Sequence, residues 1–413
     1  MVIGGGIVGL TSAYALARKG YRVTVIDKLP GVSEMCSRAN AGIIAVGHAH
    51  AWAEPQAIAS IFRALLGREP SVKITRLFDP QLWRWGLHFL RHCTSAAHRD
   101  NSLKLLKLSM LSSELLARVE DDMQLERAIR HQGGLYLYKD AQQFERKAAS
   151  LDEDSLQVLN TEQLIRYEPW LMNMRQELVG GILSPRDGVG DCYQFSQRCY
   201  QYLNDSKDVE FMFGCRVHKL EQNQNRIVAV QTDRGRIPCQ QVLLATGIET
   251  PELTASLGFK PLIYPVKGYS GTWQISDPEA VPRIPFVDES EFLAVGSYGG
   301  SLRVTAIAEF AGRDTALSEQ RLDVLQRYVQ RHLPDAVDTE NAQFWTGMRP
   351  TTPTGVPYLG RVRHLENLWL NAGHGQLGWT MSMGCAQVIA QLMSTGSSAL
   401  SDVSIKASWL QPA

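Results

Sequence analysis

The residues with the most recognisable chemical role are three glycines and one acid near the N-terminus. Gly4, Gly6 and Gly9 follow a short apolar run, and Asp27 ends the next apolar run. In a dinucleotide-binding turn the first glycine permits a tight bend, the second lets the backbone approach a pyrophosphate, and the third lets a helix pack closely on a strand. The acid binds ribose hydroxyls. This spacing predicts a dinucleotide site, and the helical run at 10–19 disfavours a surface hairpin.

Arg349 is the second candidate, because it is a lone cation among apolar and turn residues at 344–357. A guanidinium in such surroundings is costly unless it is paired. A bound carboxylate would pair with it through two parallel hydrogen bonds. An Asp or Glu elsewhere in the chain would serve equally well, so the spacing leaves a ligand-binding role and a structural role open.

A second glycine-rich turn lies near the C-terminus. Residues 368–380 run from an apolar strand through glycines into a last helix, which is predicted to end near Ser394. The positive end of this helix dipole could stabilise negative charge on a reduced flavin ring. His374 lies in the turn, where a helix-capping role and a chemical role are both open.

Three further segments are candidates for the wall of the site. Small residues around Asn40 suit a backbone that passes close to a flat cofactor, although a plain loop would have the same composition. His48 and His50 could line an active site, and no third ligand supports a metal site there. The buried run that ends in Thr246 and Gly247 predicts a parallel strand whose carboxyl end meets the cofactor.

The length and composition of the chain predict a two-domain protein. The chain has 413 residues, and segments of two kinds alternate along it, which implies two interleaved domains. Lys plus Arg and Asp plus Glu both number 42, so the charge balance offers no support for a nucleic-acid partner. The cysteines are scattered and odd in number, which predicts reduced thiols in a cytoplasmic protein.

One segment raises the question of membrane contact. No apolar run approaches the roughly 18 residues of a membrane-spanning helix. Residues 82–108 mix aromatic, aliphatic and basic side chains. They predict either a helix packed on the core or an interfacial helix with its aromatic residues in a membrane and its basic residues near headgroups. The second alternative predicts a peripheral protein on the cytoplasmic face of the inner membrane.

Together these motifs resemble a known family. The chain is similar to bacterial D-amino-acid dehydrogenases of the small-subunit type, within the FAD-dependent D-amino-acid oxidase and glycine oxidase superfamily. The matching stretches follow the family's order over nearly the whole chain, at residues 4–9, 25–27, 39–42, 91–94, 132–134, 190–195, 264–270, 344–350 and 373–381.

The resemblance implies an α/β fold, in which a Rossmann-like FAD-binding domain is interleaved with an α+β substrate domain built on a mostly antiparallel sheet. The FAD-binding domain is expected to comprise residues 1–50, 180–258 and 341–405. The substrate-binding domain is expected to comprise residues 51–179 and 259–340. No cysteine lies in the turn at 373–380, which favours non-covalent binding of FAD.

The resemblance also implies roles for individual residues. Arg349 would hold a substrate carboxylate, and Lys267 and Tyr269 would approach the flavin or the substrate. The catalytic candidates are Arg349, Lys267, Tyr269, His374 and His48. The residues expected at the cofactor are Gly4, Gly6, Ile7, Val8, Gly9, Asp27, Lys28, Ser37, Ala39, Asn40, Ala41, Gly42, Val217, Thr246, Gly247, Gly347, Arg349, Gly373, Gly375, Gln376, Leu377, Gly378, Trp379 and Thr380.

The implied reaction is the oxidative deamination of D-amino acids. A hydride passes from the substrate Cα–H to flavin N5, and water hydrolyses the resulting imino acid to a 2-oxo acid and ammonia. The electrons then pass to a quinone or another carrier. Because the enzyme's main tasks are to present the Cα–H and to exclude water, positioning by Arg349 is most of its contribution. No dedicated catalytic base is expected.

Three departures from the family pattern fall where the pocket or its lid is expected. Residues 47–52 lack the family's tyrosine, Thr354 stands in place of an Asp, and residues 305–306 replace a pair of glycines. These changes leave open a sibling enzyme that acts on proline, hydroxyproline, L-amino acids, glycine or sarcosine, with O₂ as an alternative acceptor. The remote alternative is a non-catalytic flavoprotein subunit, and the presence of Arg349 together with the turn at 373–380 argues against it.

Overall fold

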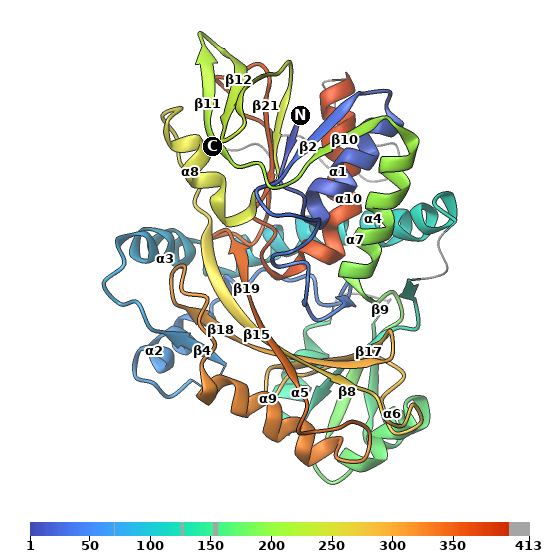
Figure 1. Ribbon diagram of the computed structural model, residues 1–413. Helices are drawn as coiled ribbons and strands as arrows, with labels where there is room; N and C mark the ends of the chain where they lie inside the picture. The colour runs from blue at the N-terminus through green and yellow to red at the C-terminus, as the bar shows by residue number, and fades with distance from the viewer. Residues whose placement is uncertain (70, 125–127, 152–155, 396–413) are drawn as a thin grey trace.

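The computed structural model describes residues 1–69, 71–124, 128–151 and 156–395. In the view of Figure 1 a small sheet with its helices forms the upper half, and a broad curved sheet crosses the lower half. Segments distant in sequence contribute to each half, as the mixed colours show. Residues 396–405, the end of the predicted FAD-binding interval, lie outside the described residues.

The upper half is built on a six-stranded sheet in the order β10-β2-β1-β14-β21-β20, which we call the parallel sheet. All neighbouring strands in it are parallel except β20 and β21. The central strands are short and apolar, as expected for parallel strands that are covered on both faces. The strands are β1 (Val2–Ile3), β2 (Val23–Ile26), β10 (Val209–Met212), β14 (Val242–Leu244), β20 (Tyr358–Arg361) and β21 (Leu368–Ala372).

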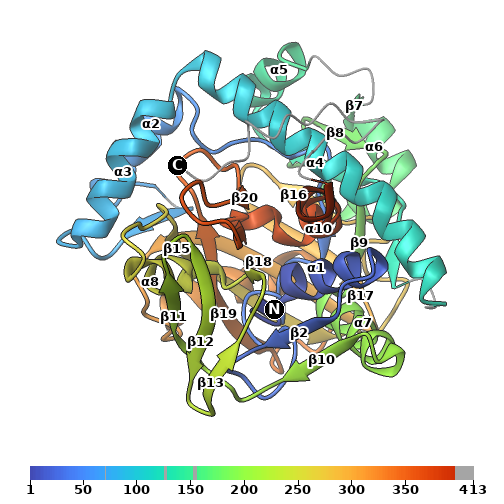
Figure 2. The same ribbon diagram turned by 90° about the horizontal axis from the view of Figure 1, so that it is seen from above.

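Four helices and a small sheet cover the two faces of the parallel sheet. Helices α1, α4, α7 and α10 share one apolar core with it, and Figure 2 shows α1 and α10 side by side with the long α4 running past them. A sheet of β11, β12 and β13 packs over the opposite face. The bounds are α1 (Ile7–Arg18), α4 (Ser95–Asp122), α7 (Cys192–Ser206), α10 (Gly378–Thr395), β11 (Val217–Asn223), β12 (Arg226–Thr232) and β13 (Gly235–Pro238).

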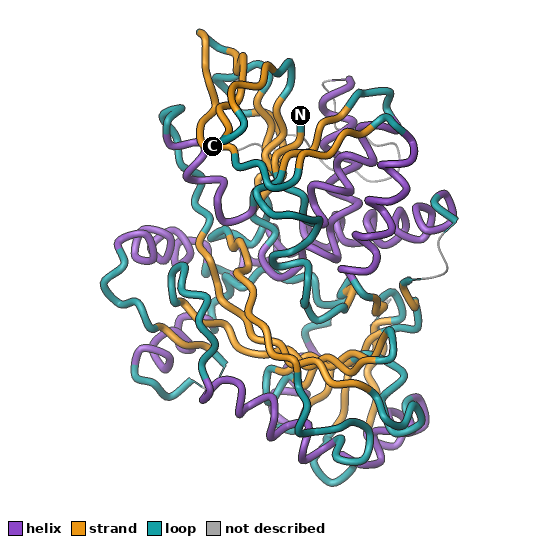
Figure 3. The backbone as a smooth tube through the Cα atoms, viewed as in Figure 1, coloured by secondary structure: helices purple, strands orange, loops and turns teal. Residues whose placement is uncertain are grey.

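The lower half is a nine-stranded sheet in the order β19-β15-β18-β17-β16-β6-β8-β7, with β4 beside β18, and we call it the antiparallel sheet. Within the described residues its pairs are antiparallel except β16–β6 and β18–β4. Helix α9 lies beneath it, on the face turned away from the upper half (Figure 3). The bounds are β4 (Val72–Ile74), β6 (Gly134–Tyr138), β7 (Gln157–Asn160), β8 (Gly180–Ser184), β15 (Tyr264–Gln274), β16 (Phe286–Asp288), β17 (Leu293–Tyr298), β18 (Ser301–Phe310), β19 (Gln343–Thr351) and α9 (Glu319–His332).

The remaining elements connect or flank the two halves. Helices α2 and α3 lie at one side of the molecule, next to β4 and β18 (Figure 1). None of the helices in the described part of the chain has the length and apolar character that crossing a membrane requires. The bounds are α2 (Ala57–Leu65), α3 (Pro80–His92), α5 (Ala141–Ala149), α6 (Thr161–Tyr167), α8 (Thr250–Ala255), β3 (Ile43–Ile44), β5 (Ile129–Arg130), β9 (Gly188–Gly190), and the 3₁₀ helices η1 (Pro169–Met174), η2 (Gly247–Glu249) and η3 (Gly375–Leu377).

The predicted fold class is confirmed: a nucleotide-type α/β half is interleaved with a half built on a mostly antiparallel sheet. The helix predicted at 10–19 begins earlier, at Ile7, directly after the glycine turn. The domain intervals stay a prediction. Strands β8 and β19, which those intervals assign to the FAD-binding domain, pair within the antiparallel sheet.

Candidate active site

A single continuous cavity of about 1250 Å³ runs between the two halves. It is larger than the roughly 300–1,000 Å³ of most ligand pockets, so it has room for a large cofactor and a small substrate. Of the residues predicted at the site, all line this cavity except Gly9, Gly42, Gly373 and Lys267. The structure therefore brings together residues from both ends of the chain, as the motifs predict.

The glycine turn between β1 and α1 has the geometry that its sequence predicts. Gly4 has a φ of 109°, and a Cβ there would lie 2.5 Å from the carbonyl oxygen of Ala245 at the end of β14. A Cβ on Gly9 would overlap the carbonyl oxygen of Gly4, so helix and turn touch without intervening side chains. A Cβ on Gly6, in contrast, would meet only Ser37 Oγ, at 3.6 Å, and Gly6 lines the cavity.

The acid at the end of β2 is held by backbone amides. Asp27 Oδ2 accepts a hydrogen bond from the Gly5 N–H at 2.6 Å, and Oδ1 accepts one from the Leu29 N–H at 2.8 Å. Burial raises the pKa of this carboxyl, and the two amide bonds oppose that rise. Next to it, Lys28 forms an ion pair with Glu249 of η2, which joins the strand ends of β2 and β14 across this end of the cavity.

The turn before α10 forms another part of the wall. Residues 374–380 all line the cavity, and Thr380 Oγ1 accepts a hydrogen bond from the Ala45 N–H at 3.1 Å, which links the turn to β3. His374 occupies the N-cap position of η3, but its side chain makes no capping hydrogen bond. Its side chain is buried, its Nε2 atom has no hydrogen-bond partner in the described part of the chain, and burial lowers its pKa to about 4.

Arg349 of β19 is the most unusual charge in the cavity. Its Nη1 donates a hydrogen bond to the Ile307 carbonyl oxygen at 2.8 Å. No carboxylate of the described residues lies within ion-pair distance of its guanidinium, so the structural acid that the sequence left open is not found there. Burial lowers the pKa of Arg349, with Cys36 opposing the shift. A partly buried cation that lines a cavity, with most of its five N–H donors unassigned, is suited to an anionic ligand.

A β-bulge in the antiparallel sheet places the Ile307 carbonyl oxygen next to Arg349. The pairing of β15 with β18 shifts register between Lys267 and Tyr269, and Ile307 in the bulge has a φ of 69°. A β-branched residue in this left-handed region is strained, and such strain clusters at functional sites. Gly268 lies opposite, and any Cβ there would overlap the guanidinium of Arg349. The bulge and the glycine therefore create the space that Arg349 occupies.

Lys267 and Tyr269 were expected to approach the flavin or the substrate, and the structure gives both of them internal partners instead. Lys267 is buried, does not line the cavity, donates to the Ala316 carbonyl, and lies 3.9 Å from Glu309 Oε2. Tyr269 reaches the cavity wall, but its hydroxyl donates to Glu309 Oε2 at 2.5 Å, and its ring belongs to the apolar core under the sheet. Because the polar groups of Lys267 and Tyr269 already have internal partners, we assign neither residue a contact with a ligand.

His48 and His50 lie at the other end of the cavity, over strands β16 and β6. His48 Nε2 is 2.9 Å from Glu289 Oε1, and His50 Nε2 is 3.2 Å from Lys147 Nζ. Sequence reasoning did not select Gly268, Ile307, Glu249, Glu289 or Lys147. Gly268 could have been selected from the sequence, because it belongs to the 264–270 motif. The other four residues reach the site only through tertiary contacts.

The comparisons with known proteins agree with this geometry. A family described as FAD dependent oxidoreductase matches residues 1–392.

This chain belongs to that family.

The chain is 35% identical over 398 residues to a D-amino acid dehydrogenase of Vibrio vulnificus (strain YJ016), which covers 95% of each protein. It is 36% identical over 398 residues to a D-amino acid dehydrogenase of Rhizorhabdus wittichii, again covering 95% of each. Among solved structures, glycine oxidase from Bacillus cereus ATCC 14579 superposes with a TM-score of 0.73 at 18% identity, covering 96% of this chain and 94% of that one.

The protein is thus an FAD-dependent oxidoreductase, and the cavity suits the cofactor that the family implies. The glycine turn would be closed by any side chain at Gly4 or Gly9, whereas Gly6 opens on the cavity. The free N–H groups at the start of α1 favour a pyrophosphate. At the other end, His374 Nε2 and Trp379 Nε1 are buried polar atoms that have no partner among the described residues. The individual cofactor contacts stay a prediction.

Proposed function

We propose that this protein is a D-amino-acid dehydrogenase that uses non-covalently bound FAD. The observation that carries the proposal is Arg349, a partly buried cation whose guanidinium faces the cavity and meets no carboxylate within the described residues. An amino acid supplies the missing carboxylate. Bacterial relatives of 35% and 36% identity over nearly the whole chain bear the name D-amino acid dehydrogenase, which favours this substrate class.

The chain's own contribution is to bind and orient the substrate. Arg349 would grip the carboxylate with two parallel hydrogen bonds, which fixes the direction of the Cα–H bond. Ile307 holds the guanidinium in place from the other side. The apolar walls exclude water, and the neutral His374 adds no competing charge. Bound FAD supplies the two-electron acceptor, held by the glycine turn, by Asp27 and by the turn at 374–380.

Non-covalent attachment is supported by the state of the thiols in the cavity wall. Cys36 and Cys215 line the cavity. Burial raises the pKa of the Cys36 thiol to about 11, and its Sγ donates to the Met348 carbonyl oxygen at 2.5 Å. A protonated, hydrogen-bonded thiol is a poor nucleophile. The cofactor should therefore be released when the protein is unfolded in acid, and a flavin that stays with the chain would contradict this part of the proposal.

We further propose that the protein lies peripherally on a membrane and passes electrons to a quinone dissolved there. Helices α2 and α3 and the residues next to them expose a group of apolar side chains: Phe62 is 64% exposed, Leu66 68%, Phe78 97% and Leu87 59%. The rim of the cavity includes Leu87 with other residues of α3. Aromatic and aliphatic side chains beside arginines are typical of interfacial helices. An apolar acceptor could then reach the cavity from the lipid.

The membrane proposal has its own test. Phe62, Leu66, Phe78 and Leu87 would be changed together to serine, and sedimentation with lipid vesicles would be compared with that of the wild type. We expect the wild type to pellet with the vesicles and the variant to stay in the supernatant, with unchanged FAD content and unchanged reduction by substrate. A wild type that does not pellet would contradict membrane contact without affecting the assignment of the reaction.

The decisive test of the reaction is anaerobic reduction of the FAD-bound enzyme by a panel of amino acids. We expect D-amino acids to remove the absorbance of oxidised flavin and their L-enantiomers to leave it unchanged. Reduction only by L-amino acids, proline, glycine or sarcosine would move the assignment to a sibling activity. Reduction by none of them would overturn the enzymatic proposal.

A further inference from the structure

The cavity contains a second group of charged and polar side chains, separate from Arg349. We call it the distal lobe, and it consists of His48, His50, His98, Lys147 and Glu289, all of which line the cavity. These residues come from the segment after β3, from α4, from α5 and from the end of β16. Neither the FAD-binding turns nor the carboxylate site includes them.

The distal lobe lies on the same face of the same sheet as Arg349. The strand order from β19 to β6 is β19-β15-β18-β17-β16-β6. Arg349 extends from β19 as far as β18, where it bonds to Ile307, and Glu289 follows β16 two strands further on. At the usual spacing, two strands correspond to roughly 10 Å. Small residues, Ala294 and Ala306, line the cavity in between, so the path along the sheet is open.

The acid in the distal lobe has a histidine close beside it. His48 Nε2 lies 2.9 Å from Glu289 Oε1, and the His48 ring stacks on Tyr136 with 4.9 Å between centroids. The backbone beside His48 is fixed, because the Gly47 N–H donates to Asp187 Oδ1 at 2.8 Å. Burial alone would raise the pKa of Glu289, but His48 and Lys147 hold it below its usual value. Glu289 is therefore ionised and paired.

The cation in the distal lobe is Lys147, and its hydrogen-bond partner is a histidine. Lys147 Nζ donates to His50 Nε2 at 3.2 Å. Burial, reinforced by His48 and Lys147, holds the pKa of His50 well below its usual value, so His50 is a neutral acceptor. No carboxylate of the described residues forms an ion pair with Lys147. The Nδ1 atom of His98 is also buried without a hydrogen-bond partner in the described part of the chain.

We propose that the distal lobe binds an anionic group at the end of the substrate side chain, so that the enzyme prefers D-amino acids with a second carboxylate. This inference rests on the proposed function, which supplies the first carboxylate at Arg349. Lys147 would donate to the second carboxylate, and His98 would add a hydrogen bond through Nδ1. The two ends of the substrate would then be recognised by two cations on one sheet face.

The test compares D-glutamate with D-leucine in anaerobic reduction of the FAD-bound enzyme, in wild type and in Lys147→Met. We expect the wild type to be reduced by D-glutamate at least about tenfold more efficiently. In Lys147→Met the efficiency with D-glutamate should fall about ten- to hundredfold, the usual effect of one charged hydrogen bond, and that with D-leucine should stay within about threefold. Lys219→Met, an exposed position on β11, is the matched control and should change neither.

The outcomes separate this inference from the proposed function. Reduction by D-leucine with no preference for D-glutamate, a preference for D-lysine, or an equal loss for both substrates in Lys147→Met would overturn the distal lobe while leaving D-amino-acid oxidation intact. Reduction by neither D-amino acid would overturn the function itself.

A second measurement requires no variant. Glutarate and pentanoate have the same number of carbons, but only glutarate carries two carboxylates. We expect glutarate to compete with substrate at least about tenfold more tightly than pentanoate, because both carboxylates find a cation. Equal competition by the two acids would contradict the proposal even if Lys147→Met failed to fold.

Discussion

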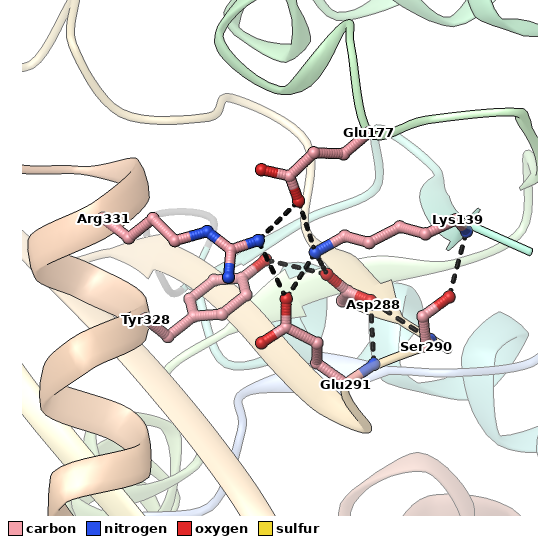
Figure 4. Close-up of polar contacts among 7 residues, drawn as sticks. All are labelled: Lys139, Glu177, Asp288, Ser290, Glu291, Tyr328 and Arg331. Atoms are coloured by element: carbon pink, nitrogen blue, oxygen red, sulfur yellow. Dashed lines mark hydrogen bonds and ion pairs between the residues drawn. The ribbon is translucent and has the colours of Figure 1, made fainter.

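Two partly buried cations lie on opposite faces of the antiparallel sheet, and they differ in their partners. Lys139, which follows β6, contacts Asp288 Oδ2 at 2.9 Å, Glu177 Oε2 at 3.0 Å and Glu291 Oε1 at 2.5 Å on the face covered by α9 (Figure 4). Arg349, on the cavity face, bonds one carbonyl oxygen and meets no carboxylate of the described residues. The same sheet thus carries one cation surrounded by acids and one left for a ligand.

The difference also appears in the pKa values. Burial alone would lower the pKa of Lys139, but its hydrogen bonds to Glu291 and Asp288 raise it above the usual value. Burial lowers the pKa of Arg349, and no acid opposes it. A buried charge that the chain neutralises contributes to structure, whereas one that it leaves unpaired is a candidate for binding. We therefore expect removal of Arg349 to reduce activity and removal of Lys139 to reduce stability.

The paired side of the sheet contains a group that could be mistaken for a metal site. Glu177, Glu291 and His332 have ligand atoms within 4.8 Å of one another. Lys139 and Arg331 already bond to both acids, as Figure 4 shows. Because the two cations neutralise this group, we assign it a structural role.

The largest expected effect is on activity, in Arg349→Met. Loss of two charged hydrogen bonds to the substrate should reduce the efficiency of anaerobic flavin reduction by D-amino acids on the order of a thousandfold. The free energy of unfolding should change by less than about 1 kcal/mol, since no internal ion pair is lost. Arg349→Lys should fall between the two, because lysine lacks the planar fork. If Arg349→Met lost stability but kept its activity, the proposed difference between Arg349 and Lys139 would be wrong.

Lys139→Met should have the opposite outcome. Leaving Asp288 and its neighbours without their shared cation should lower the free energy of unfolding by about 3 kcal/mol in urea titrations. The efficiency of the folded enzyme should stay within about threefold of the wild type. Adding Asp288→Asn should restore part of the stability, since the two changes act on one contact. Additive losses in the double variant would show that the network is not coupled.

The contrast extends to His374, a second cavity-side group without a partner in the described part of the chain. Its pKa lies at about 4 in the folded protein against an ordinary 6.5, so the unfolded chain binds the proton more readily. Its contribution to stability is fully present above about pH 6.5 and is lost as the pH falls toward 4, by about 2 kcal/mol near pH 5. His374→Gln should flatten this decline in urea titrations, and His218→Gln at an exposed site should not.

The smallest expected effect concerns two glycines of β15, one on the Arg349 side of the strand and one on the core side. A Cβ introduced by Gly268→Ala would overlap the Arg349 guanidinium, and should raise the KM for D-amino acids about tenfold without loss of stability. Gly271→Ala, on the same strand, would instead overlap the core residue Trp273, and should cost stability without changing the KM. Equal KM values in the two variants would mean that Gly268 does not create the space for Arg349.

Much of the nucleotide half could be predicted because its signals are local. The glycine spacing determines the turn, and Gly4 and Gly9 have the close contacts that the spacing predicts. The α/β class was implied by the family resemblance that these motifs carry. Local signals could not decide between a ligand and an internal acid for Arg349, because an ion pair depends on which strands become neighbours.

The parts of the site that escaped prediction depend on register. Lys267 and Tyr269 belong to a motif that suggests a catalytic role, yet the Tyr269 hydroxyl donates to Glu309 and Lys267 Nζ donates to the Ala316 carbonyl oxygen. Which face of a strand a residue occupies changes with a single shift of register, and the bulge at Ile307 is such a shift. Lys147 and Glu289 are far apart in sequence and meet only across the cavity.

The position of β1 at the centre of the parallel sheet has a consequence for biogenesis. β1 pairs with β2 and with β14, and β14 pairs with β21 near the end of the described chain. Closing such long loops is slow and comes late in folding. A nascent chain would carry the glycine turn first and receive the opposite wall of the cavity last, at residues 374–380. We therefore expect flavin loading to begin only after residues 374–380 have been synthesised and have joined the cavity wall.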